Sequence, residues 1–217
     1  DAIAGEAKLL FDPAKLTIGN ASEEDTSIVF DGHAQDYYIG LDDTDDDLKI
    51  GLGSAVGTTA HMVFDETGAI LKPLQPAFLS NSSTASNVTG DATTYTILWN
   101  GTQRFDQGAD FDETTGLFTA PVTGRYYFFV GFRISGILSA HDYGWSEIQT
   151  SNSYTNVFVV DPYGAAAGAS HTTLGQNGSF FCDMDASDTA KVQMGFEGGT
   201  KVIDIESPSN FGGYLVC

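Results

Sequence analysis

The chain has 217 residues, enough for one large domain or two modest ones, and its 29 acidic and 9 basic residues give a net charge of −20. This scarcity of lysine and arginine argues against nucleic acid as a partner and against attachment to anionic membrane surfaces. The 25 glycines, the 12% aromatic content and the lack of long amphipathic runs favour an all-β fold. No apolar run reaches the ~18 residues of a membrane span, so we expect no insertion into a membrane.

The first 72 residues are predicted to form an acidic, β-rich region, because they carry 15 acidic and 4 basic residues against 14 and 5 in the longer remainder. Short alternating segments between Asp- and Gly-containing turns predict strands at residues 16–19, 27–32, 37–41, 48–53 and 61–70. Each segment is too short to bury a core alone. Two interpretations stay open, a fibre shaft whose chains stack or intertwine to share one core, and a separate small β-domain.

Residues 42–47 form an acidic run that resembles part of a calcium loop, since calcium prefers several carboxylate oxygens. Asp43, Asp45 and Asp47 would fill positions one, three and five. Leu48 then stands where the loop needs glycine, and Ser54 where it needs the bidentate glutamate. A solvated acidic turn and a calcium site both remain open, and calcium is the one cofactor that the sequence raises.

Residues 72–76, KPLQP, place two prolines where the composition changes, which predicts a boundary between regions 1–72 and 73–217. Residues 111–130, FDETTGLFTAPVTGRYYFFV, then predict a turn, a short strand, a proline turn and a long aromatic strand. Tyr127 and Phe129 share one face of that strand, where an antiparallel sheet would normally be polar, so we expect another subunit to cover them. The other face can fill a sandwich core and consists of Tyr126, Phe128, Val130, Phe132 and Ile134.

This stretch resembles the signature of the complement-1q globular head, a jelly roll shared with the tumour-necrosis-factor family. Further motifs follow in the family's order, namely Phe78, residues 178–185 (GSFFCDMD) and residues 210–216 (NFGGYLV). The resemblance covers roughly residues 74–217. It implies an antiparallel jelly-roll sandwich, a homotrimer and a domain without catalytic chemistry, but it does not fix what the domain binds.

Between residues 135 and 170 the chain departs from the family pattern. Exposed aromatic rings in this region could stack on sugars or anchor a protein receptor. The candidates for receptor contact are Tyr143, Trp145, Tyr154 and Tyr163. Trp145 lies in an alternating segment, so a core position is the alternative for that residue.

The sequence contains no motif that predicts catalysis, and we expect no enzyme. A Gly-x-Ser-x-Gly elbow is missing, and the glycine-rich residues 51–57 lack the following helix that a phosphate loop needs. Cys182 is predicted to be a buried structural thiol, because it shares a strand face with Phe180 and Met184. Whether it pairs with Cys217 stays open.

Residues 16–53 resemble segments that precede the head domains of bacteriophage fibre proteins. We therefore predict a trimeric fibre or appendage protein on the outside of a virion, whose head attaches to a glycan or protein receptor of the host cell. Its N-terminal side would contact other virion proteins. The alternatives are a capsid- or tail-decoration protein without receptor binding, and a secreted complement-1q-like lectin or ligand-binding module, in which the five Asn-x-Ser/Thr sequons would be glycan acceptors.

Overall fold

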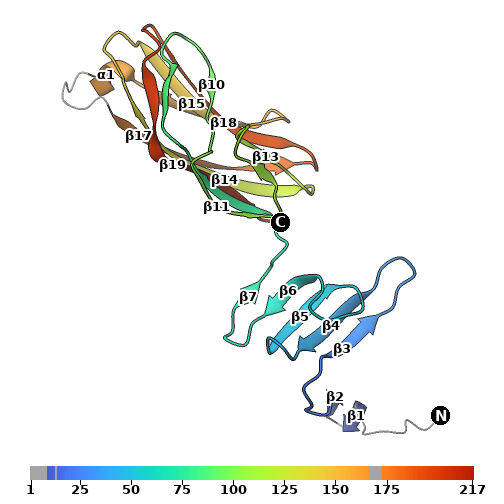
Figure 1. Cartoon of the computed structure of the whole chain (residues 1–217). Helices are drawn as coiled ribbons and strands as arrows, with labels where there is room; N and C mark the ends of the chain where they lie inside the picture. The colour runs from blue at the N-terminus through green and yellow to red at the C-terminus, as the bar shows by residue number, and fades with distance from the viewer. Residues whose placement is uncertain (1–8, 13, 167–172) are drawn as a thin grey trace. The chain divides into compact units, whose positions relative to one another are not determined.

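The computed structural model describes residues 9–12, 14–166 and 173–217. The chain divides into two compact units, Asp1–Gln75 and Pro76–Cys217, and the second unit is called the head below. Figure 1 traces the strands of the first unit from blue to cyan and those of the head from green to red. Strands build the sheets of both units, which confirms the all-β prediction, and the helix α1 (Pro162–Ala166) is a single short turn.

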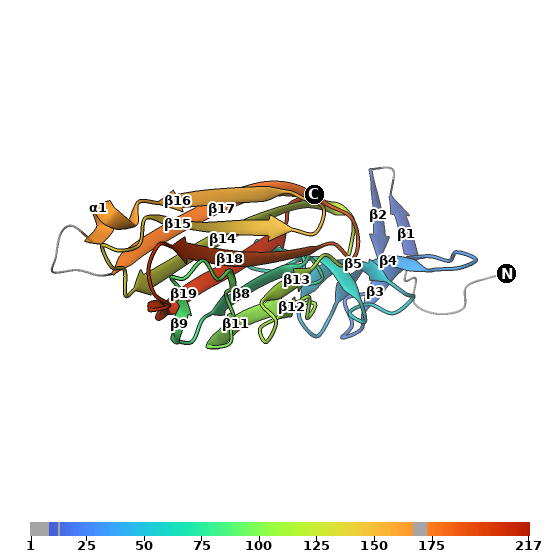
Figure 2. The ribbon, with the colours of Figure 1, turned by 90° about the horizontal axis from the view of Figure 1, so that it is seen from above.

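In the described residues of the head, two six-stranded antiparallel sheets face each other, and their long strands run along the length of the head (Figure 2). The β14 sheet has the order β11-β8-β19-β14-β17, with β9 paired to β19. Its strands are β8 (Ala77–Asn81), β9 (Ala85–Thr89), β11 (Thr102–Gln107), β14 (Gly124–Ser135), β17 (Leu174–Met184) and β19 (Ile203–Leu215). The β15 sheet has the order β12-β13-β18-β15-β16, with β10 paired to β18. Its strands are β10 (Tyr95–Thr96), β12 (Phe111–Asp112), β13 (Leu117–Thr119), β15 (Tyr143–Thr150), β16 (Thr155–Val160) and β18 (Thr189–Glu197).

Alternation along β14 separates a buried face from an outward face. The buried face is the predicted one, which confirms the assignment made from the sequence, and it comprises Tyr126, Phe128, Val130, Phe132 and Ile134. Tyr127 and Phe129 point to the other side and are half-buried. The period of two therefore fixes which side chains enter the core.

The core of the head lies between the two sheets and is rich in aromatic rings. Phe78 of β8 stacks on Phe111 of β12 with 4.4 Å between ring centroids, and Phe128 of β14 meets Phe118 of β13 edge-on at 5.4 Å. These contacts join one sheet to the other. Trp99 is fully buried in the same cluster. The head thus has the two-layer architecture in which each sheet covers the apolar face of the other.

The first unit contains a five-stranded antiparallel sheet, called the N-terminal sheet, in the order β3-β4-β5-β6-β7. Its strands are β3 (Thr26–Phe30), β4 (Tyr37–Asp42), β5 (Asp47–Leu52), β6 (Ala60–Phe64) and β7 (Ile70–Leu71). A separate hairpin, β1 (Leu9–Asp12) with β2 (Lys15–Ile18), precedes it. The described part of the chain contains no helix with the length and apolarity that crossing a membrane would require.

The prediction of one strand over residues 61–70 is wrong, because a turn divides this segment into β6 and β7. The carboxylate of Asp65 accepts the N–H of Thr67 at 2.7 Å, and the N–H of Gly68 bonds to the carbonyl of Asp65 at 2.8 Å. Gly68 has a φ of +96°, a conformation that glycine adopts without strain. An Asp-x-Thr-Gly turn therefore reverses the chain where the sequence pattern was read as continuous.

Candidate functional site

The outward side of the β14 sheet carries a cluster of apolar side chains, called the aromatic face. It consists of Leu79, Phe105, Tyr127, Phe129, Phe181 and Tyr214. Tyr127 lies at its centre, with ring centroids 5.3 Å from Phe181 on β17 and 5.5 Å from Tyr214 on β19. Phe181 remains 57% exposed. Apolar rings of this size on the solvent side of an antiparallel sheet are typical of a surface that another molecule covers.

Phe129 reaches across the sheet because its neighbour in β19 is glycine. A Cβ atom added to Gly212 would lie only 2.5 Å from Cζ of Phe129. The ring therefore lies low over the backbone, next to a hollow of about 400 Å³. That hollow is lined by Tyr127, Phe129, Val130, Gly131, Asn177, Gly178, Ser179 and Asn210. Aromatic rings and amide side chains thus adjoin on one side of the sheet.

Sequence reasoning found Tyr127 and Phe129 but not the rest of the aromatic face. Phe181 could have been found, because Phe180 and Cys182 beside it were assigned to the opposite face of the same strand. Tyr214 and Phe105 come from strands far apart in the sequence and join the cluster only through the pairing of β19, β8 and β11. The order of the strands in the sheet brings these side chains onto one surface. The sequence pattern does not determine that order.

The outward side of the β15 sheet holds two of the four receptor-contact candidates, Tyr143 and Trp145, which are two residues apart on β15. Trp145 is half-buried and belongs to the outward face, so the structure does not place it in the core. A Cβ atom added to Gly195 on β18 would lie 2.8–2.9 Å from three indole atoms, so the indole rests against this glycine. Val159 is paired with Trp145 on the other side and is 64% exposed.

The surroundings of Trp145 combine apolar and polar groups. In the next row of the same face, Glu147 lies opposite Val157 on one side and Gln193 on the other. The amide of Gln193 donates to the hydroxyl of Thr96 at 3.1 Å. Burial raises the pKa of Glu147, an effect that Lys191 opposes. An aromatic ring beside carboxylate and amide groups is chemistry that suits a sugar or a polar protein surface.

The structure places Tyr154 and Tyr163 outside the strand β15 that carries Trp145. Tyr154 is exposed in the turn between β15 and β16, about 16 Å from Trp145 at ~3.3 Å per residue along the hairpin. Tyr163 is exposed in the helix α1, which follows β16. Tyr143 and Trp145 therefore form the candidate contact pair, while Tyr154 lies toward the opposite end of the hairpin.

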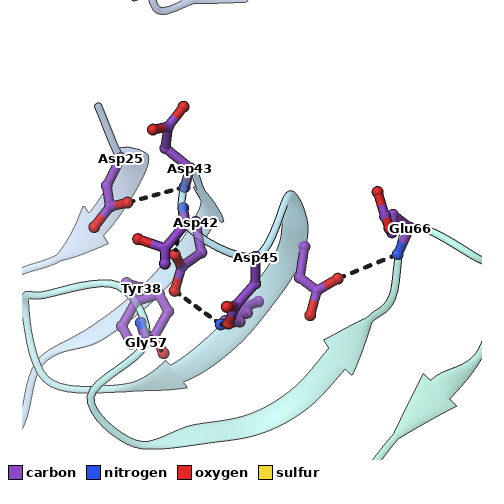
Figure 3. Close-up of polar contacts among 10 residues, drawn as sticks. Asp25, Tyr38, Asp42, Asp43, Asp45, Gly57 and Glu66 are labelled. Atoms are coloured by element: carbon purple, nitrogen blue, oxygen red, sulfur yellow. Dashed lines mark hydrogen bonds and ion pairs between the residues drawn. The ribbon is translucent and has the colours of Figure 1, made fainter. Parts of the chain in front are cut away.

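The acidic run of the N-terminal sheet is engaged by protein groups (Figure 3). Lys49 bonds to the carboxylate of Asp42 at 2.8 Å and also to that of Asp45. The carboxylate of Asp47 accepts the N–H of Glu66 at 3.1 Å. Asp43 is bound through its backbone N–H, which donates to the carboxylate of Asp25.

In this arrangement the three residues of the calcium interpretation, Asp43, Asp45 and Asp47, each engage a different protein group. Within residues 9–12, 14–166 and 173–217, no group of three His, Cys, Asp or Glu side chains is placed to hold a metal ion. Desolvation and the neighbouring charges of Glu23 and Asp46 raise the pKa of Asp43. The run is a tight acidic turn in which a lysine supplies the counter-charge.

Two side chains of the head, Cys182 and His141, belong to residue types that often have reactive chemistry. Burial raises the pKa of the Cys182 thiol to about 12, which confirms the buried structural thiol, and Cys182 and Cys217 are both free rather than bridged. His141 is fully buried; its Nδ1 accepts the N–H of Leu138 at 3.0 Å, and its Nε2 lies 3.1 Å from the carbonyl of Thr200. Both side chains are buried by the fold.

Comparison with known proteins gives one family and several structures. The family model described as C1q domain matches residues 77–216. Among solved structures, the globular domain of zebrafish complement 1qA protein aligns at 19% identity and a TM-score of 0.48, covering 66% of this chain and 98% of that one. Murine APRIL aligns at 7% identity and a TM-score of 0.46, covering 65% and 99%. None of the curated proteins matches this chain.

Proposed function

Because the chain belongs to the C1q domain family, we propose that its head is the homotrimeric, non-enzymatic binding part of a virion fibre or appendage that attaches to a host-cell receptor. Domains of this family are binding modules and typically form homotrimers. The family membership accounts for the jelly-roll head and for a role in recognition. The trimer, the virion and the host-cell receptor are the proposed part.

The aromatic face is the observation that carries the proposal. Each of its rings would remove 150–250 Å² from water on complete burial, a scale of roughly several kcal/mol for the cluster. A monomer would leave Phe181 and Tyr214 in solvent beside Tyr127. Three copies packed through this face around one axis would cover all of these rings at once, which a single chain does not do.

The two outward faces of the head lie on opposite sides of the sandwich, so one can be buried while the other stays accessible. In a trimer built on the aromatic face, Tyr143 and Trp145 on the β15 sheet would remain on the outside. Three such sites on one particle appendage would act together, and avidity of this kind raises weak binding by ~10² to 10⁴ where the geometry permits. This supports attachment to a repeated glycan or protein on a cell surface.

The virion assignment has its support in the N-terminal region. An acidic β-rich unit precedes the head, and its segments resemble those ahead of the heads of bacteriophage fibre proteins. The net charge of −20 is compatible with an exposed, repulsive particle surface and unfavourable for nucleic acid. In this arrangement the N-terminal side would contact other virion proteins and the head would point outward.

The solution mass of the purified chain tests the trimer. Light scattering should give about 69 kDa, three times the chain mass of 23.0 kDa. Phe181→Asp on the aromatic face should lower the mass toward one chain, because three carboxylates would be buried without partners. Val159→Asp is the matched control, since Val159 is similarly exposed but lies on the β15 sheet, and it should keep the trimer. A parent of 23.0 kDa would refute the proposal.

Binding of the intact protein to host cells tests the receptor surface. Trp145→Ala should weaken binding at least about tenfold, the scale of an aromatic anchor residue, while Tyr154→Ala at the far end of the hairpin should not. Gly195→Ala tests the same site without removing the ring, because a methyl group there would displace the indole. If both variants keep a folded trimer and full cell binding, the receptor surface lies elsewhere.

A further inference from the structure

The N-terminal sheet has one face that is almost wholly apolar and that the described residues of its own unit leave uncovered, called the N-terminal apolar face. Strand pairing places twelve side chains on this side of the sheet, and all but Thr26 are apolar. The apolar members are Ile28, Phe30, Tyr37, Ile39, Leu41, Leu48, Ile50, Leu52, Met62, Phe64 and Ile70. Phe30 is 57% and Ile70 is 60% exposed.

The opposite face of the same sheet is covered by the chain itself. The segment between β5 and β6 folds over it, and the N–H of Gly57 in this segment donates to the hydroxyl of Tyr38 at 3.1 Å. A Cβ atom added to Gly40 would lie 2.6 Å from the side chain of Val56, so the cover packs directly on the sheet. Beneath it lies the ion pair of Lys49 with Asp42. The described part of this unit thus covers the more polar side of the sheet and not the apolar side.

The described part of this unit consequently lacks an apolar core of its own. Among the described residues of the first unit, Tyr38 and Val63 are the buried hydrophobic side chains, whereas the head holds a continuous cluster between two sheets. A single sheet with one exposed apolar face is only marginally stable in water, because it needs a second layer to cover that face. A second layer over this face would therefore stabilise the sheet.

We propose that the N-terminal apolar face packs against the same face of other copies of this chain, so that the copies share one core. The face carries no charged side chain in its described strands, so it offers no charge complementarity to a foreign charged surface. The charges of the N-terminal sheet lie in its turns and on its covered face, where they do not oppose apposition of the apolar faces. Other copies are also the one partner that is available at fixed stoichiometry.

The linker favours this partner further, in an argument that rests on the proposed trimer of the head. Five residues separate β7 from β8, a span of at most about 20 Å when extended. Three sheets tethered this closely to one trimeric head would be present at an effective concentration on the order of millimolar relative to one another. Three weakly associating faces would then be held together without any further contact.

Crosslinking of the full chain tests the inference. Ile39→Cys, in a Cys217→Ser background, places a thiol at the centre of the N-terminal apolar face, and Cys182 is buried in the head. Packed sheets are about 10 Å apart, so a short bismaleimide should join two chains of the trimer. Ser54→Cys is the matched control, because Ser54 is exposed in the segment over the opposite face, and it should give no crosslink. Ile28→Cys, the cross-strand partner of Ile39, should repeat the result.

The outcomes separate this inference from the proposed trimer of the head. A trimeric mass without crosslinks at Ile39→Cys or Ile28→Cys overturns the shared core and leaves the head trimer standing. If the introduced thiols are protected from labelling but do not crosslink, another part of the same chain covers the face. This result also overturns the shared core. If Phe181→Asp leaves the trimeric mass unchanged and the crosslinks still form, the shared core is supported. The same result refutes the aromatic face as the trimer contact.

Discussion

The two units of this chain are both antiparallel β structures, but they solve the problem of covering apolar surface differently. In the head, two sheets cover each other, and Phe78 stacks on Phe111 across the interface. In the N-terminal sheet, the described residues of the unit cover a single layer on the side of Tyr38 and Lys49. Alternation of apolar and polar residues is present in both units. What differs is whether the chain supplies a second layer for the apolar side.

The largest effect that sharpens this comparison is expected in the core of the head. Phe128→Ala should destabilise the head by about 3–5 kcal/mol, because the ring is fully buried and contacts aromatic neighbours from both sheets. The N-terminal sheet should lose none of its intrinsic stability. Both tryptophans, Trp99 and Trp145, lie in the head, so urea unfolding followed by tryptophan fluorescence reports on this unit.

Phe181→Ala is the control for this prediction. It removes a ring of the same size from the outward face of the same sheet, where it contacts Tyr127 but not the core. Its effect on unfolding of the isolated subunit should be below about 1 kcal/mol, although its effect on subunit association should be larger. Equal losses for the two variants would contradict the division into core and outward faces.

The sequence predicted those parts of the head that depend on local alternation. The buried face of β14 and the burial of Cys182 follow from the period of two, and both are confirmed. The N-terminal strands from 16–19 to 48–53 were also located, because turn residues separate them. Features that depend on sheet order were beyond this reasoning. Tyr214 and Phe105 join the aromatic face only through long-range pairing.

The burial of Lys49 shows the same limit in the N-terminal sheet. A lysine in an alternating strand predicts a solvent-facing side, yet Lys49 is buried because the following segment covers that face and Asp42 supplies its counter-charge. Alternation indicates which residues share a face, but not which face is covered. The cover comes from a long-range loop, and its position is a property of the folded chain.

The ion pair beneath this cover gives the second prediction. Asp42→Asn should destabilise the N-terminal sheet by about 3 kcal/mol, because it leaves the buried Lys49 without its buried counter-charge. Asp45→Asn should cost less than about 1 kcal/mol, since the Asp45 side chain is 54% exposed. Hydrogen exchange of β4 and β5 peptides measures the effect in the intact protein. The protection of β14 peptides should not change, and a parallel loss there would contradict independent stability of the two units.

Acidification gives the smallest expected effect. It distinguishes the contribution of the Lys49–Asp42 ion pair to stability from that of the other charged residues. The hydrogen bond from Lys49 holds the pKa of Asp42 below its ordinary value of 3.8, so the folded state binds this proton less tightly than the unfolded chain does. The stabilisation from Asp42 is therefore complete above the unfolded pKa and is lost as the pH falls through the lower, folded pKa. Protonation of the other acids relieves repulsion and acts in the opposite direction, so the parent alone is ambiguous.

The difference between the parent and Asp42→Asn removes that ambiguity, because both chains share every other acid. Their difference in stability of the N-terminal sheet should be constant from neutral pH to about 5 and should shrink below about 4, where the aspartate of the parent becomes neutral like the asparagine. Hydrogen exchange of β4 and β5 at matched intrinsic rates is the measurement. A difference that is independent of pH down to 2 would mean that Asp42 does not stabilise the sheet through its charge.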